Sequence, residues 1–309
     1  MISLRVPSSE PSSAAVETLR SSGNELVDTQ PALALHQRRL DMAIERAKAS
    51  AARQRTDSSI TDFDVRGELY GLAHEVAPLA RQEELDVLNA LALPTAGEQT
   101  IDVAAGTGFV TEALLQWTEQ APYAVDPSRE QLGILKQRVP SAVTLLGCPD
   151  DPDVFQRQPL PQFDLATSLG GLHHVQDQRR MFANVASVLR PGGRFVFGDV
   201  GAGTSVAEHF DVHVTTKCLT GHSANWLSPE RLPELLEGTG LALVRASVRL
   251  LHMRFQSELQ MALFFKGLHA YDLSPEAIAE DLVTTLGVTE RDGLICLKWP
   301  LLYAYLQKA

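Results

Sequence analysis

The sequence predicts an α/β fold in which a parallel sheet carries helices on both faces. Short runs of β-forming residues alternate with helical segments through the middle of the chain, a pattern typical of parallel sheets. The expected strands are residues 100–103, 123–125, 143–146, 163–168 and 194–200. The helices expected between them are residues 110–119, 129–137 and 179–189. This order brings the carboxyl ends of the strands to one edge, where open α/β sheets bind ligands.

Helical sequence flanks the alternating region. Before it, apolar residues recur at helical spacing over residues 37–55, and residues 81–93 form a second helix that leads into the first strand. After it, residues 201–239 show no clear strand and predict helices, one of them opened by Ser228-Pro229. The remaining expected elements are strands at 242–251 and near 297–306, and helices at 206–217, 258–269 and 275–286.

The composition excludes several classes of protein. The 309 residues carry a formal net charge of -11, and a surface of that sign repels nucleic-acid phosphates. No apolar run is long enough to cross a bilayer, and the N-terminal segment lacks the apolar stretch of a secretory signal. The three cysteines are odd in number and far apart, which favours a reducing compartment. We therefore expect a soluble, cytoplasmic protein that binds neither nucleic acid nor membrane.

A glycine-rich turn follows the first expected strand. The run T-I-D-V-A-A-G-T-G-F-V-T over residues 100–111 ends a strand, turns on Gly106 and Gly108, and begins a helix. Glycines let the backbone approach a ligand closely, and the first N–H groups of the helix then face it. Asp126 closes the second strand, where a carboxylate can accept hydrogen bonds from both ribose hydroxyls. This order of features predicts nucleoside binding.

Two features separate this loop from that of dinucleotide-binding dehydrogenases. Their pattern needs a third glycine, G-x-G-x-x-G, and Thr111 stands at that position. Asp102 lies just before the loop, where a carboxylate would repel a pyrophosphate but suits a ligand that carries an ammonium group.

The motifs resemble the class I S-adenosylmethionine-dependent methyltransferases. The resemblance rests on D-V-A-A-G-T-G-F-V-T at 102–111, D-P-S-x-x-Q-L at 126–132, F-D-L-A-T-S-L-G-G-L-H-H-V at 163–175 and L-R-P-G-G-R at 189–194. The last two motifs are similar to the subgroup that contains the ubiquinone and menaquinone biosynthetic methyltransferases. The resemblance covers about residues 98–200 and implies a Rossmann-like, seven-stranded methyltransferase sheet whose last strand is antiparallel. S-adenosyl-L-methionine is the implied cofactor, with S-adenosyl-L-homocysteine as its product.

The resemblance also implies a set of cofactor-binding residues. The methionine part would lie among Asp102, Ala104, Gly106 and Gly108, the ribose on Asp126, and the adenine beside Pro127 and Leu132. Family members often read G-D-A after the third strand, whereas here Cys148 and Pro149 follow Gly147, so either Asp150 or Asp151 would contact the adenine. The complete expected set is Asp102, Ala104, Gly106, Thr107, Gly108, Asp126, Pro127, Leu132, Asp150 and Ser168.

Histidines mark the expected acceptor side of the site. His173 and His174 follow the fourth strand and are candidate general bases, although either could instead pack against the cofactor. His209 and His213 are spaced i, i+4 in the cap, and we interpret them, with His222 and Trp226, as substrate-binding residues. A metal site at the i, i+4 pair is the alternative, and we predict none because methyl transfer of this class does not require one.

These observations predict an enzyme that methylates a small organic metabolite on O, C or N. The expected parts are a mobile tail at 1–36, a helical extension at 37–93, a cofactor-binding core at 94–200, a helical cap at 201–239, and the end of the sheet with a second helical insertion at 240–309. The alternatives are a cofactor-binding protein that does not methylate, such as a regulator or cyclase, and a protein or tRNA methyltransferase. A homodimer is left open.

Overall fold

An eight-stranded sheet forms the centre of the protein. The computed structural model describes residues 30–54 and 61–309. The strand order is β3-β2-β1-β4-β5-β8-β6, with β7 added beside β8. The strands are β1 (Thr100–Val103), β2 (Tyr123–Asp126), β3 (Val143–Leu146), β4 (Phe163–Leu169), β5 (Leu189–Asp199), β6 (Leu241–Phe255), β7 (Val288–Arg291) and β8 (Leu294–Lys308). Strands β1 to β5 pair in parallel, and β8 is antiparallel to both β5 and β6.

The predicted fold is confirmed, with one additional strand. Seven strands form the expected sheet and the last of them, β8, is antiparallel to its neighbours. The added strand β7 forms a short hairpin with β8 through Asp292 and Gly293, both at positive φ (54° and 73°). Asp-Gly is a strong hairpin signal because a tight turn of this kind needs positive φ at both central residues. The sequence therefore carries a local signal for β7, although the predicted set of strands omits it.

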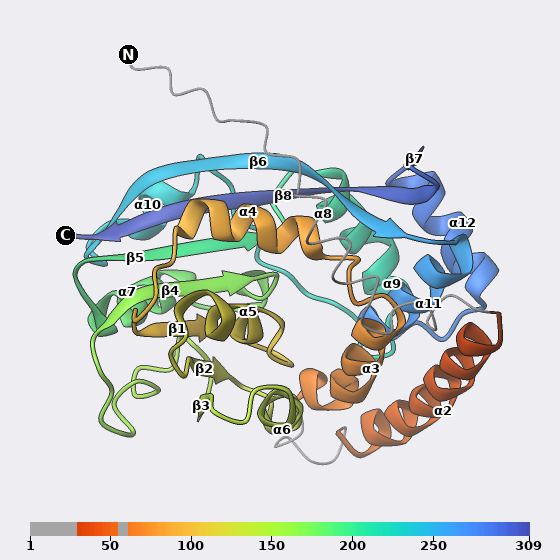
Figure 1. Cartoon of the computed structure of the whole chain (residues 1–309), viewed down its shortest axis with the longest axis horizontal. Coiled ribbons are helices and arrows are strands. Elements are labelled where there is room, and N and C mark those ends of the chain that lie inside the picture. The colour runs from red at the N-terminus through yellow and green to blue at the C-terminus, as the bar shows by residue number, and fades with distance from the viewer. Residues whose placement is uncertain (1–29, 55–60) are drawn as a thin grey trace.

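Helices cover both faces of the sheet, and each face has its own buried core. In Figure 1, α4 (Gln82–Ala92) and α5 (Phe109–Thr118) lie in front of the sheet, and α7 (Gln178–Val188) and α10 (Leu232–Leu236) lie behind it. The front core includes Leu88, Leu114 and Val196, and the rear core includes Phe182 and Phe195. Because neighbouring residues of a strand point to opposite faces, Phe195 and Val196 belong to different cores.

Four helices gather beyond the carboxyl ends of the parallel strands, as Figure 1 shows on the right of the molecule. They are α2 (Gln30–Gln54), α3 (Asp62–Val76), α11 (Glu258–Leu268) and α12 (Pro275–Thr285). Helix α2 begins at Gln30, so residues 30–36 are helical and the prediction of a tail there is wrong; residues 1–29 lie outside the described range. The apolar stripe of α2 includes Leu33, so the helical pattern starts earlier than we predicted. No helix in the described ranges is both long and apolar enough to span a membrane.

Helix α11 approaches α3 so closely that one position requires glycine. A Cβ atom added to Gly267 would lie 2.6 Å from the Leu69 carbonyl oxygen and 2.9 Å from the Ala73 Cβ. Both obstacles are rigid parts of α3, so the two helices would have to separate. This contact fixes the N-terminal helices against the second insertion.

We therefore expect Gly267→Ala to destabilise the fold by about 1–3 kcal/mol, the usual cost of overpacking a core. Thermal unfolding should show a clear drop in Tm. Gly133→Ala is the matched control, because Gly133 lies inside helix α6 (Arg129–Arg138) with no atom within 4 Å of an added Cβ. Alanine there should leave Tm unchanged or raise it, since alanine is the better helix former. Equal Tm values for Gly267→Ala and wild type would contradict this account of the packing.

The predicted cap helix is present in a modified form. Residues 205–217 form α8 (Ser205–His209), a π-helical turn at Phe210–Val214, and α9 (Thr215–Lys217). The Thr204 side chain caps α8 by accepting from the Ala207 N–H. The π turn brings Phe210 towards the carboxyl ends of the strands, where it lines a cavity.

Candidate active site

The glycine loop adopts the backbone that its sequence predicts. Ala104, Gly106 and Gly108 all have positive φ, at 58°, 55° and 87°. A Cβ on Gly108 would lie 2.8 Å from Leu135 Cγ, so this position needs glycine for packing as well as for its backbone. The Asp126 carboxylate fastens the loop to β2 by accepting from the Gly106 N–H at 2.8 Å, while its other oxygen accepts from the Ser128 N–H at 2.9 Å.

A cavity of about 160 Å³ opens above this loop. Seven of the ten predicted cofactor-binding residues line it: Asp102, Ala104, Gly106, Thr107, Asp126, Pro127 and Asp150. Gly108, Leu132 and Ser168 do not. Gly108 caps α5, Leu132 packs beneath the loop, and Ser168 is buried in β4. These three residues support the loop and the strand beneath the cavity without lining it. Asp151 forms an ion pair with Arg157, which leaves Asp150 as the acid on the cavity wall.

Two buried carboxylates dominate the electrostatics of this cavity. Asp102 is 1% exposed and accepts from the Thr111 hydroxyl at 2.7 Å, and burial raises the pKa of Asp102 to about 7. Burial likewise raises the pKa of Asp126 to about 6. The Thr107 hydroxyl, also buried on this wall, has no hydrogen-bond partner in the described structure. Buried acids and a free hydroxyl suit a ligand that brings several donors, such as an ammonium group and ribose hydroxyls.

We expect the affinity for S-adenosylhomocysteine to fall as the pH is lowered. Above pH 7 both carboxylates are ionised and can accept hydrogen bonds from the ligand. As the pH falls, protonation of Asp102 and then of Asp126 removes hydrogen-bond acceptors that the ligand needs. Calorimetry should show the Kd rising by about tenfold or more between pH 8 and pH 5.5. Near pH 6.5, binding should release protons, because the ligand favours the ionised carboxylates. A Kd that is constant over this range would contradict the assignment.

The N-terminal helices complete the cavity, a role that the sequence pattern did not predict. Phe63, Arg66 and Tyr70 of α3, together with Arg81 before α4, line it. Helix α3 is docked by Asp64, whose Oδ1 accepts from the Ser128 hydroxyl at 2.7 Å. Ser128 caps α6 by accepting from the Gln131 N–H. The Gln131 side chain donates to the Phe63 carbonyl and so does not complete a capping box.

A second, smaller cavity of about 70 Å³ adjoins the first. The two cavities share five lining residues: Arg66, Tyr70, Arg81, Gly170 and His174. The second cavity extends beneath the cap and is mostly apolar and aromatic, with Phe210 and Trp299 in its wall. Small-molecule sites commonly have this apolar and aromatic lining with a few polar groups.

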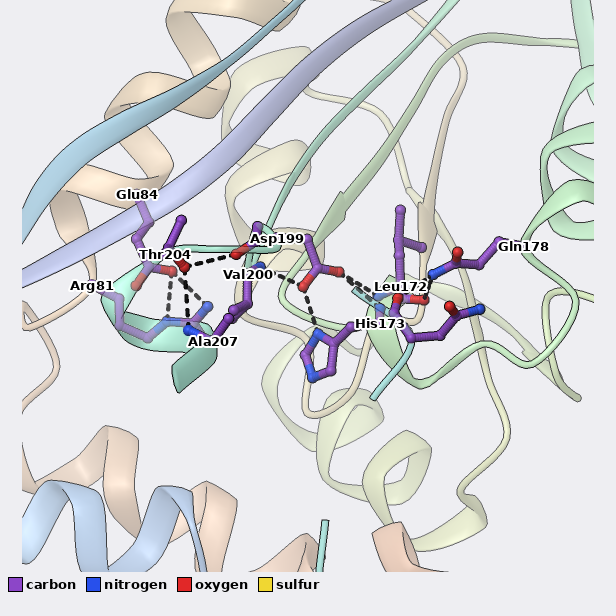
Figure 2. A network of polar contacts seen from close by, with 11 residues as sticks. Arg81, Glu84, Leu172, His173, Gln178, Asp199, Val200, Thr204 and Ala207 are labelled. Atoms are coloured by element: carbon purple, nitrogen blue, oxygen red, sulfur yellow. Dashed lines mark hydrogen bonds and ion pairs between the residues drawn. The ribbon is translucent and has the colours of Figure 1, made fainter. Parts of the chain in front are cut away.

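His173 faces the second cavity and is held by Asp199, as Figure 2 shows. The His173 Nδ1 lies 2.5 Å from the Asp199 Oδ1. The Asp199 carboxylate is fully buried at the end of β5 and also accepts from the backbone N–H groups of Leu172, His173 and Val200. The His173 Nε2 has no partner in the described structure. A carboxylate on Nδ1 fixes the tautomer that leaves Nε2 free to accept a proton.

Two further histidines converge on His173. Burial lowers the pKa of His174 well below its usual value and that of His222 to about 3, so both rings are neutral. Together with His173 they form the one group of possible metal ligands found in the described ranges, with ligand atoms within 4.8 Å of one another. The geometry therefore allows a metal site at His173, His174 and His222 rather than at the i, i+4 pair.

The cap residues predicted to bind substrate are only partly in place. His222 lines the second cavity, whereas His209 and His213 line neither cavity. Both face α12: His209 Nδ1 lies 2.8 Å from the Thr285 hydroxyl, and His213 Nδ1 lies 2.6 Å from Asp281 Oδ1. Trp226 lies outside the cavity lining, stacked on His222 with ring centroids 5.8 Å apart. The helical spacing correctly predicted that His209 and His213 share one helix face. It did not predict that this face contacts α12.

Comparisons with known proteins agree with this geometry. Residues 101–197 match the family described as methyltransferase domain. An uncharacterised methyltransferase of Mycobacterium tuberculosis is 33% identical over 129 residues, which are 41% of this chain and 49% of that protein. A ubiquinone biosynthesis O-methyltransferase of Coxiella burnetii is 25% identical over 154 residues, 48% of this chain and 65% of that protein. The chain thus spans about half to two thirds of the length of these relatives.

Solved structures show the same fold. A phosphoethanolamine N-methyltransferase of Haemonchus contortus, solved with S-adenosylhomocysteine, superposes with a TM-score of 0.52 at 14% identity, covering 81% of this chain and 60% of that one. The YcgJ protein of Bacillus subtilis superposes with a TM-score of 0.51 at 20% identity, covering 74% of this chain and 99% of that one. Residues 101–197 are therefore similar to the methyltransferase-domain family in sequence, and the fold and the glycine loop agree with that match. The predicted resemblance is confirmed, and S-adenosylmethionine is the cofactor that such a domain implies.

Proposed function

We propose that the protein transfers a methyl group from S-adenosylmethionine to a small organic acceptor. The observation that carries the proposal is the junction of the two cavities at Gly170 and His174. One cavity has the glycine loop and buried acids that suit the cofactor; the other lies beneath the cap and carries a proton acceptor. The residues that would hold the cofactor are Asp102, Thr107, Asp126 and Asp150. When bound, the cofactor supplies an activated methyl group whose transfer leaves a neutral thioether.

The protein's own part in the reaction is to align the acceptor and take its proton. An acceptor O–H or N–H placed in the second cavity would lose its proton to His173 Nε2. Asp199 would then stabilise the imidazolium through Nδ1–H without accepting the proton itself. The apolar wall excludes water and holds the acceptor in line with the methyl group, and alignment supplies much of the rate enhancement in such transfers.

The place of the second cavity favours a small metabolite over a polymer. A space of about 70 Å³ beneath the cap is too small to take up a folded RNA or protein segment. The three free cysteines fit the reducing cytoplasm, where we place the protein. We retain as alternatives a non-methylating cofactor-binding protein and a protein or tRNA methyltransferase.

Transfer of a labelled methyl group separates these possibilities. The protein would be incubated with methyl-labelled S-adenosylmethionine and, separately, a small-molecule extract, bulk tRNA and a protein extract. Label should appear only with the small-molecule extract, and His173→Gln should abolish its appearance. Label in tRNA or protein would show that the acceptor is a polymer and not a small molecule. Cofactor binding without label in any fraction would favour the regulator or cyclase.

A further inference from the structure

A buried guanidinium in the acceptor region has no acidic partner. Arg66 on α3 is 9% exposed and lines both cavities. Its Nε donates to the Asp62 carbonyl at 3.3 Å, its Nη1 lies 3.9 Å from Cys218 Sγ, and its guanidinium carbon lies 5.3 Å from the Phe63 ring centroid. No carboxylate of the described residues lies within 4.0 Å of it. Burying a cation without a counter-charge is costly, so the guanidinium is poised for an anion that the chain does not provide.

The other charges around the second cavity are already compensated or absent. Arg81 pairs with Glu84 at 2.6 Å, and Asp199 is held by His173 and three backbone N–H groups. Burial keeps His174, His222 and His269 neutral. Arg66 therefore leaves this cavity with one uncompensated positive charge.

Both arginines line both cavities, but their other contacts differ. The Arg81 guanidinium carbon lies 4.8 Å from the ring centroid of Phe109, directly after the glycine loop, which is the cofactor side. Arg66 instead reaches towards Cys218 in the cap, and its charge acts on His174, His222 and His269. Arg81 is thus the better candidate for the carboxylate of the cofactor, and Arg66 for a group on the acceptor.

We propose that the methyl acceptor is a small aromatic acid whose carboxylate pairs with Arg66. This inference rests on the proposed function and specifies its substrate class. A guanidinium binds a carboxylate through two parallel hydrogen bonds, which fixes orientation as well as position. The rings of Phe210, Trp299 and His222 provide the wall for a flat acceptor body. The acceptor O–H or N–H would then face His173, which takes its proton as the new bond to the methyl carbon forms.

Matched acids and amides test the charge requirement. The probes are 4-hydroxybenzoate and 6-hydroxy-2-naphthoate, each beside its neutral amide, titrated calorimetrically into the protein saturated with S-adenosylhomocysteine. At least one acid should bind tenfold or more tightly than its amide to wild type. In Arg66→Met that preference should fall to within about twofold, while the Kd for S-adenosylhomocysteine also stays within about twofold. If neither acid is preferred while S-adenosylhomocysteine still binds, the acidic acceptor is ruled out but the proposed function is not.

Arg66→Met also separates an acceptor contact from two other roles. If Arg66 held the cofactor, the variant would bind S-adenosylhomocysteine at least tenfold more weakly, an effect that we expect of Arg81→Met instead. If Arg66 were structural, the variant would have a lower Tm. We expect a Tm equal to or above that of wild type without ligand, because methionine keeps the apolar stem and removes an unpaired buried charge. Arg245→Met, an exposed residue on β6, controls for the loss of charge alone. Weaker cofactor binding or a lower Tm in Arg66→Met would each overturn the proposal.

Discussion

Replacing Asp126 by alanine is expected to weaken binding of S-adenosylhomocysteine by about 2–4 kcal/mol, which is about 30-fold to 1000-fold in Kd. The carboxylate is 5% exposed, lines the cofactor cavity and would accept two charge-assisted hydrogen bonds from the ribose. It also holds the Gly106 N–H, so its loss loosens the loop as well. Both effects act on binding, and calorimetry measures their sum.

Two variants make this result interpretable. Asp126→Asn keeps the size of the side chain but loses the charge. Its Kd for S-adenosylhomocysteine should lie between those of Asp126→Ala and wild type. Asp153→Ala, an exposed acid outside the cavity lining, should bind as wild type does. All the variants should keep a wild-type circular dichroism spectrum. A Kd for Asp126→Ala within twofold of wild type would mean that the ribose is held elsewhere.

The second large effect is expected on turnover. His173→Gln should lower kcat/KM by about 10²–10⁴, the usual contribution of a positioned general base, with the Kd for S-adenosylhomocysteine within about twofold. Asp199→Asn should lower kcat as well, because an amide can no longer stabilise the protonated His173 ring. His213→Gln is the matched control, since His213 pairs with Asp281 and lies outside both cavities.

A chelator distinguishes a base from a metal ligand in the same variants. Loss of wild-type activity with a strong chelator, restored by Zn²⁺, would assign His173, His174 and His222 to a metal site. Full activity in His173→Gln would show that the acceptor needs no base. We expect activity to be insensitive to the chelator and sensitive to His173.

The core of the fold could be predicted because its signals are local. Strands β1 and β3 have the predicted bounds, and β2 differs at one end only, since alternation of strand and helix needs only neighbouring residues to be recognised. The glycine loop was equally readable: Gly106 and Gly108 adopt the positive φ for which glycine is suited. Asp126 follows from the same local order.

The acceptor side could not be predicted because it is assembled from distant segments. Arg66 meets Cys218 across 152 positions of the chain, and no periodicity records such a contact. The i, i+4 spacing predicted that His209 and His213 share a helix face. The surface that they contact is α12, which comes from a later insertion and is not encoded in that spacing. The partner of His173 was likewise hidden, since Asp199 closes a different strand.

The most direct test of the account is a calorimetric titration of the wild-type protein with S-adenosylhomocysteine, with NADH as the control. We predict a single site per chain with a Kd in the micromolar range, on the order of -8 kcal/mol, and no binding of NADH. The loop with Thr111 in place of a third glycine, and the buried Asp102 beside it, account for that selectivity. No heat and no thermal shift with millimolar S-adenosylhomocysteine, or preferential binding of NADH, would contradict the account.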